Sequence, residues 1–350
     1  MHLVACIAGA AIVAGILWDA FETLVMPRTP QRRMRVTRMF SRTTWRLWSR
    51  LARRIRSNPR RERFLALYGP LSVFVLLTLW VSALVVGFAL LQWSQGERLA
   101  NLGGSPQFAD HLYMSATTLF ALGLGDLAPI GRIGRLLVVA ETGSSLLLLS
   151  MLFSYIPTVY QSYARRELRV TLLEASAGAP PSATVLLRRV AASGNLSHLD
   201  AFFADWEQWC ADLLETHLAY PAIGYFRSQH PLQSWVSALT ALLDVAALVK
   251  VGIEGLPEWR AHLAFAIARR AAVDLAGILG EPASRLDDRL PPRELATLRC
   301  ELARAGLRLN QSAEADMELN ELRSSYEPHV AALATRLMMP LPEWLPTRLS

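Results

Sequence analysis

The sequence contains almost no lysine and little cysteine. Of its 36 basic residues, Lys250 is the one lysine and the others are arginine. The three cysteines, Cys6, Cys210 and Cys300, are widely spaced and form no Cys-x-x-Cys pair, so neither a disulfide framework nor a zinc site is indicated. Residues 165–350 also lack a nucleotide-binding glycine pattern and a recognisable nucleophile–base constellation. We therefore expect no catalytic residues, no bound metal and no enzyme activity.

Charged residues are missing from long parts of the chain. From Phe64 to Gln95 there is no Asp, Glu, Lys, Arg or His, a longer stretch than the ~20 residues that cross a bilayer. A second apolar run, 136–160, contains Glu141 as its one charge, and a shorter run covers residues 3–26. With 52% hydrophobic residues, the composition excludes a wholly soluble or a disordered protein. It predicts three transmembrane helices, the first of which is alternatively an interfacial segment or a cleaved signal peptide.

The arginines are concentrated in one segment. Fourteen of them lie between Arg28 and Arg63 with a single acid, Glu62, so this segment carries about +13 and the rest of the chain about −6. Positive charge is retained on the cytoplasmic side of a membrane. We therefore expect a multi-pass protein of the cell (inner) membrane with its N-terminus outside and residues 165–350 in the cytoplasm. Because the basic segment lies between two apolar runs, nucleic acid is not an expected partner.

Apolar residues recur at helical spacing within the arginine-rich segment. Residues 28–63 therefore predict an interfacial helix whose arginines reach anionic lipid of the cytoplasmic leaflet. The residues expected to contact lipid are Arg42, Arg46, Arg50, Arg53 and Arg54. The alternative is that these charges only determine the topology.

A short segment between the second and third apolar runs carries an informative pattern. Residues 109–120 are long enough for a helix that dips into the membrane. The six residues that follow are Ala121, Leu122, Gly123, Leu124, Gly125 and Asp126. Glycine at every second position permits backbone conformations that other residues resist, so successive carbonyl oxygens can point the same way. A ring of such carbonyls replaces the hydration shell of a cation.

This segment resembles the pore loop of the potassium-channel pore-domain family, as in bacterial and two-pore-domain channels, over about residues 65–160. The matching residues are Gly123-Leu124-Gly125-Asp126-Leu127, Pro129 and Gly134-Arg135-Leu136. The resemblance implies an all-α membrane protein in which residues 64–164 form two helices and a pore loop. An extra transmembrane helix, 1–27, would precede this domain, and an all-α cytoplasmic domain, 165–350, would follow it. It also implies a homotetramer, with potassium ions in the filter and no cofactor.

One filter residue departs from the family pattern. The family usually has threonine where this chain has Ala121, and the threonine hydroxyl helps to form the innermost ion site. Ala121 therefore leaves a weakly selective cation channel as an alternative to a potassium-selective one. Another alternative is a non-conducting receptor or scaffold with a relic pore fold.

Four residues are expected to support the filter. By resemblance, Tyr113 braces Asp126, and Thr117 falls where some relatives carry an acid. Glu141 is an ionisable residue inside a span and is therefore a functional candidate. It either senses protons or bonds to the preceding pore helix, for example to Thr117 or Thr118.

The third apolar run contains candidate gating residues. By resemblance it lines the pore, and Gly143 and Ser145 belong to a small-residue patch where relatives hinge. Pro157 either kinks the helix to shape an intracellular gate or ends the membrane helix.

The C-terminal half has helical spacing of its apolar residues and no alternating strand pattern. We expect an all-α domain that assembles or regulates the channel, with an unknown cytoplasmic ligand or protein as partner. His217, Tyr220, His230 and Asp244 are polar residues among apolar ones and indicate either a ligand site or hydrogen bonds within a core. The candidate helices cover residues 181–193, 196–219, 232–253, 257–280, 291–309 and 312–338, after a helix break at 178–181.

Overall fold

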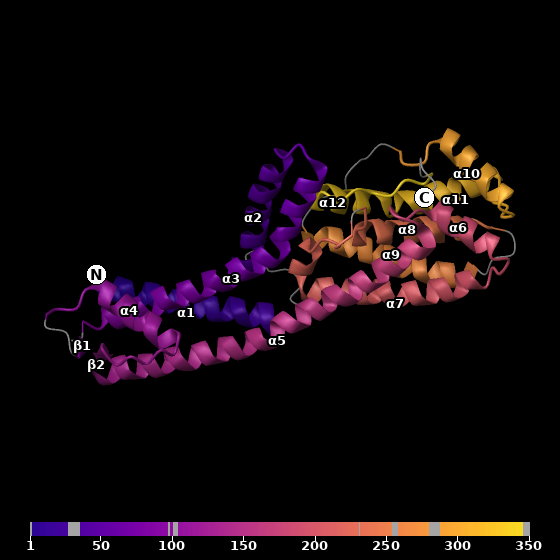
Figure 1. The fold of residues 1–350 in the computed structure, drawn as a ribbon. Helices are drawn as coiled ribbons and strands as arrows, with labels where there is room; N and C mark the ends of the chain where they lie inside the picture. The colour runs from indigo at the N-terminus through magenta and orange to yellow at the C-terminus, as the bar shows by residue number, and fades with distance from the viewer. Residues whose placement is uncertain are drawn as a thin grey trace. The chain divides into compact units, whose positions relative to one another are not determined.

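The computed structural model describes residues 2–26, 36–96, 99–100, 104–230, 232–253, 258–279 and 288–345. These residues are almost entirely helical, which confirms the expected all-α fold (Figure 1). The contacts of the chain divide it into two units, Met1–Tyr160 and Gln161–Ser350. The first part of the arginine-rich segment, residues 28–35, and the residues 254–257 and 280–287 near the ends of the candidate helices 232–253 and 257–280 lie outside the described residues.

The first unit is built from membrane helices and a short pore-loop region. Its elements are α1 (His2–Leu24), α2 (Val36–Arg53), α3 (Asn58–Ser94), β1 (Leu99–Ala100), α4 (Phe108–Leu119), β2 (Ala128–Pro129) and the first part of α5 (Arg132–Ala177). The strands β1 and β2 pair antiparallel. Helices α1, α3 and α5 are long and apolar enough to cross a membrane, as the three predicted spans require. Helix α5 continues as one helix past Tyr160 into the second unit.

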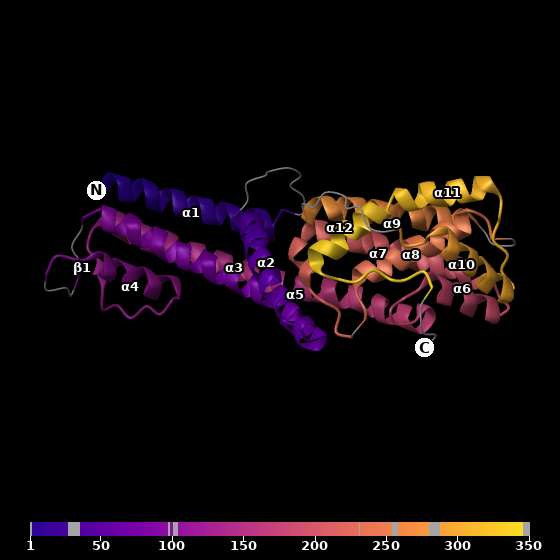
Figure 2. The same cartoon turned by 90° about the horizontal axis from the view of Figure 1, so that it is seen from above.

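Helices α1 and α3 lie side by side and approach each other closely at two glycines (Figure 2). A Cβ atom added to Gly9 would lie 2.7 Å from the carbonyl oxygen of Gly87, and one added to Gly87 would lie 2.8 Å from Val13. Both distances are too short for real contacts, so only glycine permits this approach. Small residues at helix contacts are typical of membrane proteins.

A buried acid connects three helices of the first unit. The carboxylate of Asp19 in α1 accepts hydrogen bonds from Trp80 Nε1 of α3 at 3.0 Å and from Thr37 Oγ1 of α2 at 2.8 Å. Asp19 is 4% exposed. An unpartnered carboxylate at this depth would be costly, and the two donors remove that cost.

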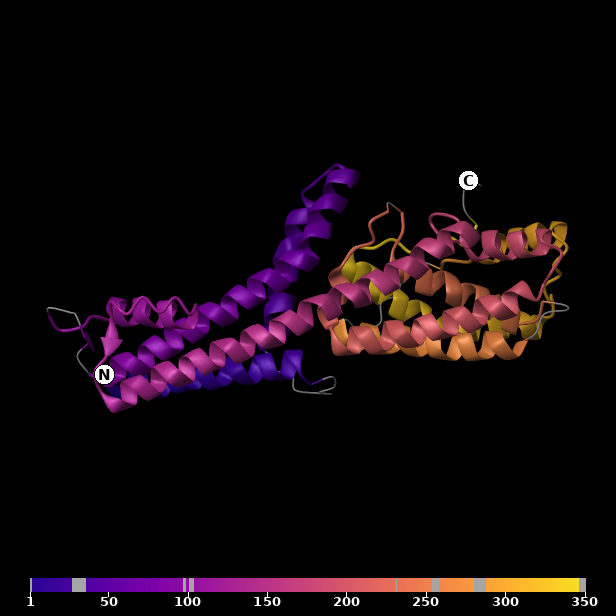
Figure 3. The same ribbon diagram turned by 60° about the horizontal axis from the view of Figure 1, so that its bottom comes forward.

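Helix α2 packs against the first turns of α3 (Figure 3). The ring of Trp45 lies 4.7 Å from that of Tyr68, and the ring of Trp48 stacks on Phe64 at 4.3 Å. The predicted single interfacial segment 28–63 is therefore divided. After α2 ends at Arg53 the chain leaves the helical conformation, and the residues from Asn58 onward belong to α3. A proline in the first turn of α3 suits this start, because the first turn needs no N–H donor there.

The second unit is a helical domain packed around one helix. Its elements are the last part of α5, α6 (Ala183–Ala192), α7 (His198–Ala219), the 3₁₀ helix η1 (Pro221–Tyr225), α8 (Trp235–Lys250), α9 (Glu258–Leu279), α10 (Pro292–Arg304), α11 (Ala313–Ser324) and α12 (Glu327–Leu337). Every residue of α8 from Trp235 to Val249 is buried. Its apolar sequence is that of a core helix, surrounded by α6, α9, α11 and α12.

One predicted helix is divided in the structure, and one predicted break agrees with it. The candidate helix 312–338 is two helices, α11 and α12, separated at Ser325 and Tyr326. Pro328 lies in the first turn of α12, where its missing N–H removes no intrahelical bond, whereas inside one long helix it would remove one. The end of α5 agrees with the predicted break at 178–181, since Gly178 has a positive φ of +83°.

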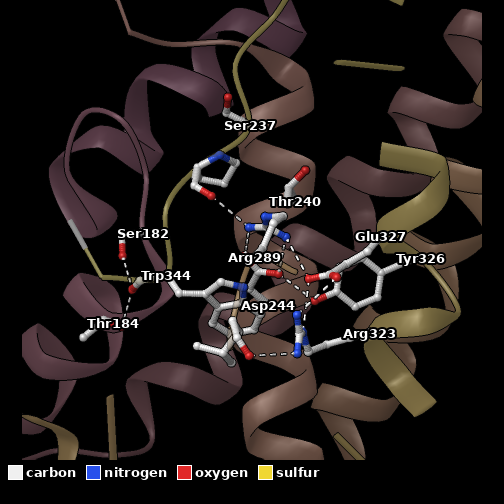
Figure 4. A network of polar contacts seen from close by, with 12 residues as sticks. Ser182, Thr184, Ser237, Thr240, Asp244, Arg289, Arg323, Tyr326, Glu327 and Trp344 are labelled. Carbon is white, nitrogen blue, oxygen red and sulfur yellow. Dashed lines mark hydrogen bonds and ion pairs between the residues drawn. The ribbon is translucent and has the colours of Figure 1, made fainter. Parts of the chain in front are cut away.

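A buried charged network holds the C-terminal segment against the second unit (Figure 4). Arg289 donates to Asp244 at 2.7 Å and to Glu327 at 3.3 Å, and the Tyr326 hydroxyl donates to Asp244 at 2.6 Å. Burial raises the pKa of Glu327, although the neighbouring arginines oppose that change. The carbonyl of Trp344 accepts from two hydroxyls at the start of α6, those of Ser182 and Thr184. Carbonyls of residues 340 and 342 also accept bonds, from Ser237 and Arg289.

Candidate ion-conduction site

The helix before the candidate filter has defined ends. At its start, the backbone N–H of Gln107 donates to Asp110 at 2.7 Å, and the two side chains form a capping box. At its end, the N–H groups of Leu122 and Ala121 donate to the carbonyls of Thr117 and Thr118, both at 2.9 Å. This pair of bonds is a Schellman motif. The partial negative charge of the helix C-terminus therefore lies next to the candidate filter.

The backbone of the candidate filter alternates in handedness. Ala121, Gly123 and Gly125 have φ values of +54°, +58° and +71°, whereas Leu122 and Leu124 between them have negative φ. In an ordinary extended strand successive carbonyls point to opposite sides, and this alternation can turn them to one side. The two glycines adopt positive φ without strain, and Ala121 does so at a cost of roughly 1–2 kcal/mol.

The candidate filter is uncovered on one side within a single chain. Leu122 and Leu124 are 60% and 61% exposed. A Cβ atom placed on Gly123 or Gly125 would meet nothing within 4 Å beyond its chain neighbours. One chain therefore supplies one set of carbonyls and leaves the filter residues exposed.

Tyr113 on α4 interacts with Asp126 after the filter. The Tyr113 side chain is exposed and lies near enough to Asp126 for an electrostatic interaction. This is the pair that the resemblance to the channel family indicated, and a hydrogen bond between the two stays a prediction. The antiparallel pairing of Leu99 with Pro129 holds the backbone just beyond Asp126.

Glu141 joins three helices behind the candidate filter. This residue of α5 has no exposed surface. Its carboxyl group accepts from Gln92 Nε2 of α3 at 2.9 Å and contacts Ser115 Oγ of α4. Ser115 also bonds to the carbonyl of Val85 at 2.9 Å. The partner of Glu141 on α4 is therefore Ser115, and not Thr117 or Thr118.

The hydrogen bonds of Ser115 indicate the protonation state of Glu141. The hydroxyl of Ser115 has one hydrogen, and it faces two acceptors, the Val85 carbonyl and Glu141. Both contacts are hydrogen bonds when Glu141 carries a proton and donates it to Ser115. In that arrangement the second oxygen of Glu141 still accepts from Gln92. A neutral acid is also the form that suits a site away from water.

The structure places the remaining predicted support and gating residues in regular helix. Thr117 Oγ1 donates to the carbonyl of Met114 in its own helix, and Thr118 contributes its carbonyl to the Schellman motif. Gly143, Ser145 and Pro157 all lie inside α5. Helix α5 does not end at Pro157 but continues to Ala177, and the role of Pro157 at an intracellular gate stays a prediction.

The arginines predicted to contact lipid lie on or next to α2. Arg46, Arg50, Arg53 and Arg54 are exposed, and Arg42 is half-buried. The exposed apolar residues Met39, Leu47 and Leu51 lie on the same helix. Basic and apolar residues thus share the surface of α2 that α3 does not cover.

Several polar residues of the first unit were missed by sequence reasoning. Gln92, Ser115, Asp19 and Trp80 make the bonds between helices described above. Their signal in the sequence is weak, because each is a single polar or amphipathic residue in an apolar run. Within the described part of the chain, no group of three His, Cys, Asp or Glu side chains is placed to hold a metal ion.

Two helices that can span a membrane, with a short helix and an alternating backbone segment between them, define the architecture of this region. Residues 74–162 match the model of a family described as ion channel, which confirms the resemblance over this segment. An ion-channel segment points to a protein that is not an enzyme.

A comparison with curated proteins finds a distant membrane-protein relative. The chain is 22% identical over 193 residues to the uncharacterized membrane protein YdjJ of Bacillus subtilis (strain 168). The alignment covers 55% of this chain and 56% of that relative. No solved structure matches the chain. These findings, with the three long apolar helices, support a multi-pass membrane protein.

Proposed function

We propose that the protein is a passive, potassium-selective cation channel formed by four copies of the chain. Ions would cross a filter made of carbonyl oxygens from Leu122, Gly123, Leu124 and Gly125. The observation that carries this proposal is the alternating handedness of residues 121–125 at the C-terminal end of α4. The ion-channel match of the surrounding residues supports it. Each layer of a filter needs four carbonyl contributors, and one chain offers one, so fourfold symmetry is the simplest assembly.

In this proposal the N-terminus lies outside the cell and residues 165–350 lie in the cytoplasm. The arginine-rich surface of α2 would then contact anionic lipid of the cytoplasmic leaflet. The permeant potassium ion is the one ion required, with no cofactor. The second unit would regulate or assemble the channel through a ligand or protein that its sequence does not identify.

The test is cation flux into liposomes that contain the purified full-length protein. We expect potassium flux to exceed sodium flux. Substituting valine for Gly125 should reduce flux by about 100-fold or more, because a β-branched residue resists positive φ. Substituting alanine for Gly277 of α9, outside the pore region, is the control, since a Cβ atom there meets nothing within 4 Å. A tetramer that passes neither ion would overturn the proposal and favour a receptor or scaffold.

A weakly selective channel is the second candidate, and Ala121 is the observation that favours it. Equal potassium and sodium fluxes would support it, and Ala121→Thr would then be expected to sharpen the selectivity. The backbone conformation of residue 121 affects how this substitution can be interpreted. Threonine is disfavoured at φ +54°, so the substitution must also change the end of α4. Ala121→Gly, which keeps the positive φ, separates the effect of the hydroxyl from that of the backbone.

A further inference from the structure

A groove lies between helices α7 and α9, which run side by side in the second unit (Figure 1). Its volume is about 290 Å³, close to the lower limit of small-molecule pockets. Both walls belong to the same unit, so the shape of the groove is defined within that unit. The residues that line it are Ala204, Glu207, Gln208 and Ala211 of α7 and Arg260 and Ile267 of α9.

The apolar part of the groove is long enough for a short hydrocarbon chain. Ala204 and Ala211 lie on one face of α7, two helical turns apart, and Ile267 lies two turns after Arg260 on α9. Two turns of helix span roughly 11 Å. Because alanine side chains are short, they leave room between the helices that larger residues would fill. An alkyl chain placed there would lose contact with water, which favours binding.

The charges in and beside the groove favour a cation. The guanidinium of Arg260 lies 4.0 Å from Asp200 and 3.7 Å from Glu207. Two carboxylates therefore share one guanidinium, which leaves a net charge of about −1. Further along α9, Arg270 pairs with Asp274 and adds no net charge. A negatively charged ligand would be repelled by this arrangement.

One carboxylate oxygen of the groove lacks a hydrogen bond. Glu207 Oε2 is shielded from water and accepts no hydrogen bond from the residues that the structure describes. Its 3.7 Å separation from Arg260 is too long for one. Buried acceptors of this kind usually have a partner, which is a ligand or water where the protein supplies none. A primary ammonium group carries three N–H donors, and the amide oxygen of Gln208 is a second acceptor on the same wall.

We propose that the groove between α7 and α9 binds a small organic cation with a primary ammonium group on a short hydrocarbon chain. The ammonium group donates to Glu207, and the chain lies against Ala204, Ala211 and Ile267. The site lies within the second unit, so it goes beyond the proposed channel and does not depend on conduction.

The test is isothermal titration of n-butylammonium into the full-length protein in detergent, with the heat of detergent micelles alone subtracted. We expect saturable binding of n-butylammonium, weaker binding of 1-butanol, which has the same chain without the charge, and no binding of butyrate. Glu207→Gln should weaken n-butylammonium binding by about ten-fold or more, because the ammonium group loses a hydrogen bond to a charged acceptor. Glu314→Gln makes the same change at an exposed residue of α11, which does not line the groove, and should bind like the parent protein.

A second variant tests the apolar part of the site. Ala211→Leu fills part of the groove and keeps every charge, so it should also weaken binding of n-butylammonium. This variant decides the matter if Glu207→Gln fails to fold. Binding that stays unchanged in Ala211→Leu and in folded Glu207→Gln would place the ligand elsewhere and overturn the site. Equal binding of 1-butanol and n-butylammonium, or no saturable binding at all, would also overturn it.

The source of the ammonium group is tested with Nα-acetyl-lysine methylamide, which carries the same group on a peptide backbone. We expect it to bind no more tightly than n-butylammonium. Binding tighter by about ten-fold would mean that the occupant is a lysine side chain of a partner protein, and the free amine would be wrong. None of these measurements uses cation flux, so failure of this site and failure of the proposed channel are separate results.

Discussion

The two units stabilise their buried acids with different partners. In the second unit, Asp244 meets the guanidinium of Arg289 at 2.7 Å, with side chains 2% and 10% exposed. In the first unit, Asp19 and Glu141 meet indole, hydroxyl and amide groups instead. A charged pair needs both ions to be removed from water, whereas neutral donors need no counter-ion. The described partners of Asp19 and Glu141 are therefore neutral groups, whereas Asp244 in the helical domain has a cation as a partner.

The units also differ in how complete they are as single chains. Fifteen residues of α8 are buried in the second unit. In contrast, the most apolar 18-residue stretch of each membrane helix is largely exposed in one chain. The buried share of that stretch is 11% for α5, 28% for α1 and 39% for α3. The second unit thus closes its core within one chain. The first unit leaves apolar helix faces for lipid and, under the proposed function, for other copies.

Breaking the ion pair of the second unit should have the largest effect. Arg289→Met leaves Asp244 buried without its cation, and we expect the free energy of unfolding of this unit to fall by about 3–5 kcal/mol. Urea unfolding of the full-length protein in detergent, followed by hydrogen exchange, measures this. Arg270→Met is the control, because its pair with Asp274 is exposed and contributes about 0–1 kcal/mol. Equal losses in the two variants would refute the distinction between buried and exposed pairs.

Overpacking the α1–α3 contact should have the next largest effect. Gly9→Ala places a Cβ atom 2.7 Å from the Gly87 carbonyl, so we expect α1 and α3 to separate at a cost of about 1–3 kcal/mol. Thermal unfolding in detergent measures this. Gly15→Ala on the same helix is the control. Its Cβ atom meets nothing within 4 Å, so it should stabilise the helix by about 0.5–1 kcal/mol. Destabilisation by both substitutions would show that the close contact is not the cause.

A protonated Glu141 predicts which of two substitutions at this position destabilises the protein more. Glu141→Gln keeps a donor for Ser115 and an acceptor for Gln92, so its stability should stay close to that of the parent protein. Glu141→Ala leaves Gln92 without this acceptor and should cost about 1–3 kcal/mol. The same thermal measurement in detergent compares them. A glutamine variant as unstable as the alanine variant would contradict a neutral Glu141.

Acid should lower the free energy of unfolding of the second unit through a buried histidine. Per pH unit, this effect is smaller than that of breaking the Asp244–Arg289 ion pair. Burial and the neighbouring Arg166 lower the pKa of His217 from its usual 6.5 to about 3. The unfolded chain binds a proton below pH 6.5 and the folded chain does not. The contribution of His217 is therefore complete above pH 6.5 and is lost as the pH falls toward 3.

We expect this loss to approach 1.4 kcal/mol per pH unit. Urea unfolding between pH 7 and 5 measures the slope, and His217→Gln should remove it. His262→Gln, at an exposed position, serves as the control and should keep the slope. An unchanged slope in the His217 variant would mean that another group carries the proton.

Much of the membrane architecture follows from the sequence because apolar length is a strong constraint. The long apolar runs predicted all three candidate spans, and the glycine spacing located the alternating segment. Ala121 shows the limit of this reasoning. The glycine spacing does not include Ala121, and its positive φ of +54° comes from the Schellman end of α4. Likewise, Glu141 was a recognisable candidate, but a lone serine gives no signal of which helix face it occupies.

Chain composition alone determined that this is a helical membrane protein with one arginine-rich segment and a separate helical half. Hydrophobic length and charge act locally, so they can be read without knowing what packs against what. Tertiary structure decided which polar groups meet. The bonds of Asp19 to Trp80 and of Asp244 to Arg289 join residues far apart in the chain. Such contacts depend on which helices pack against each other, and hydrophobic length and charge do not specify that packing.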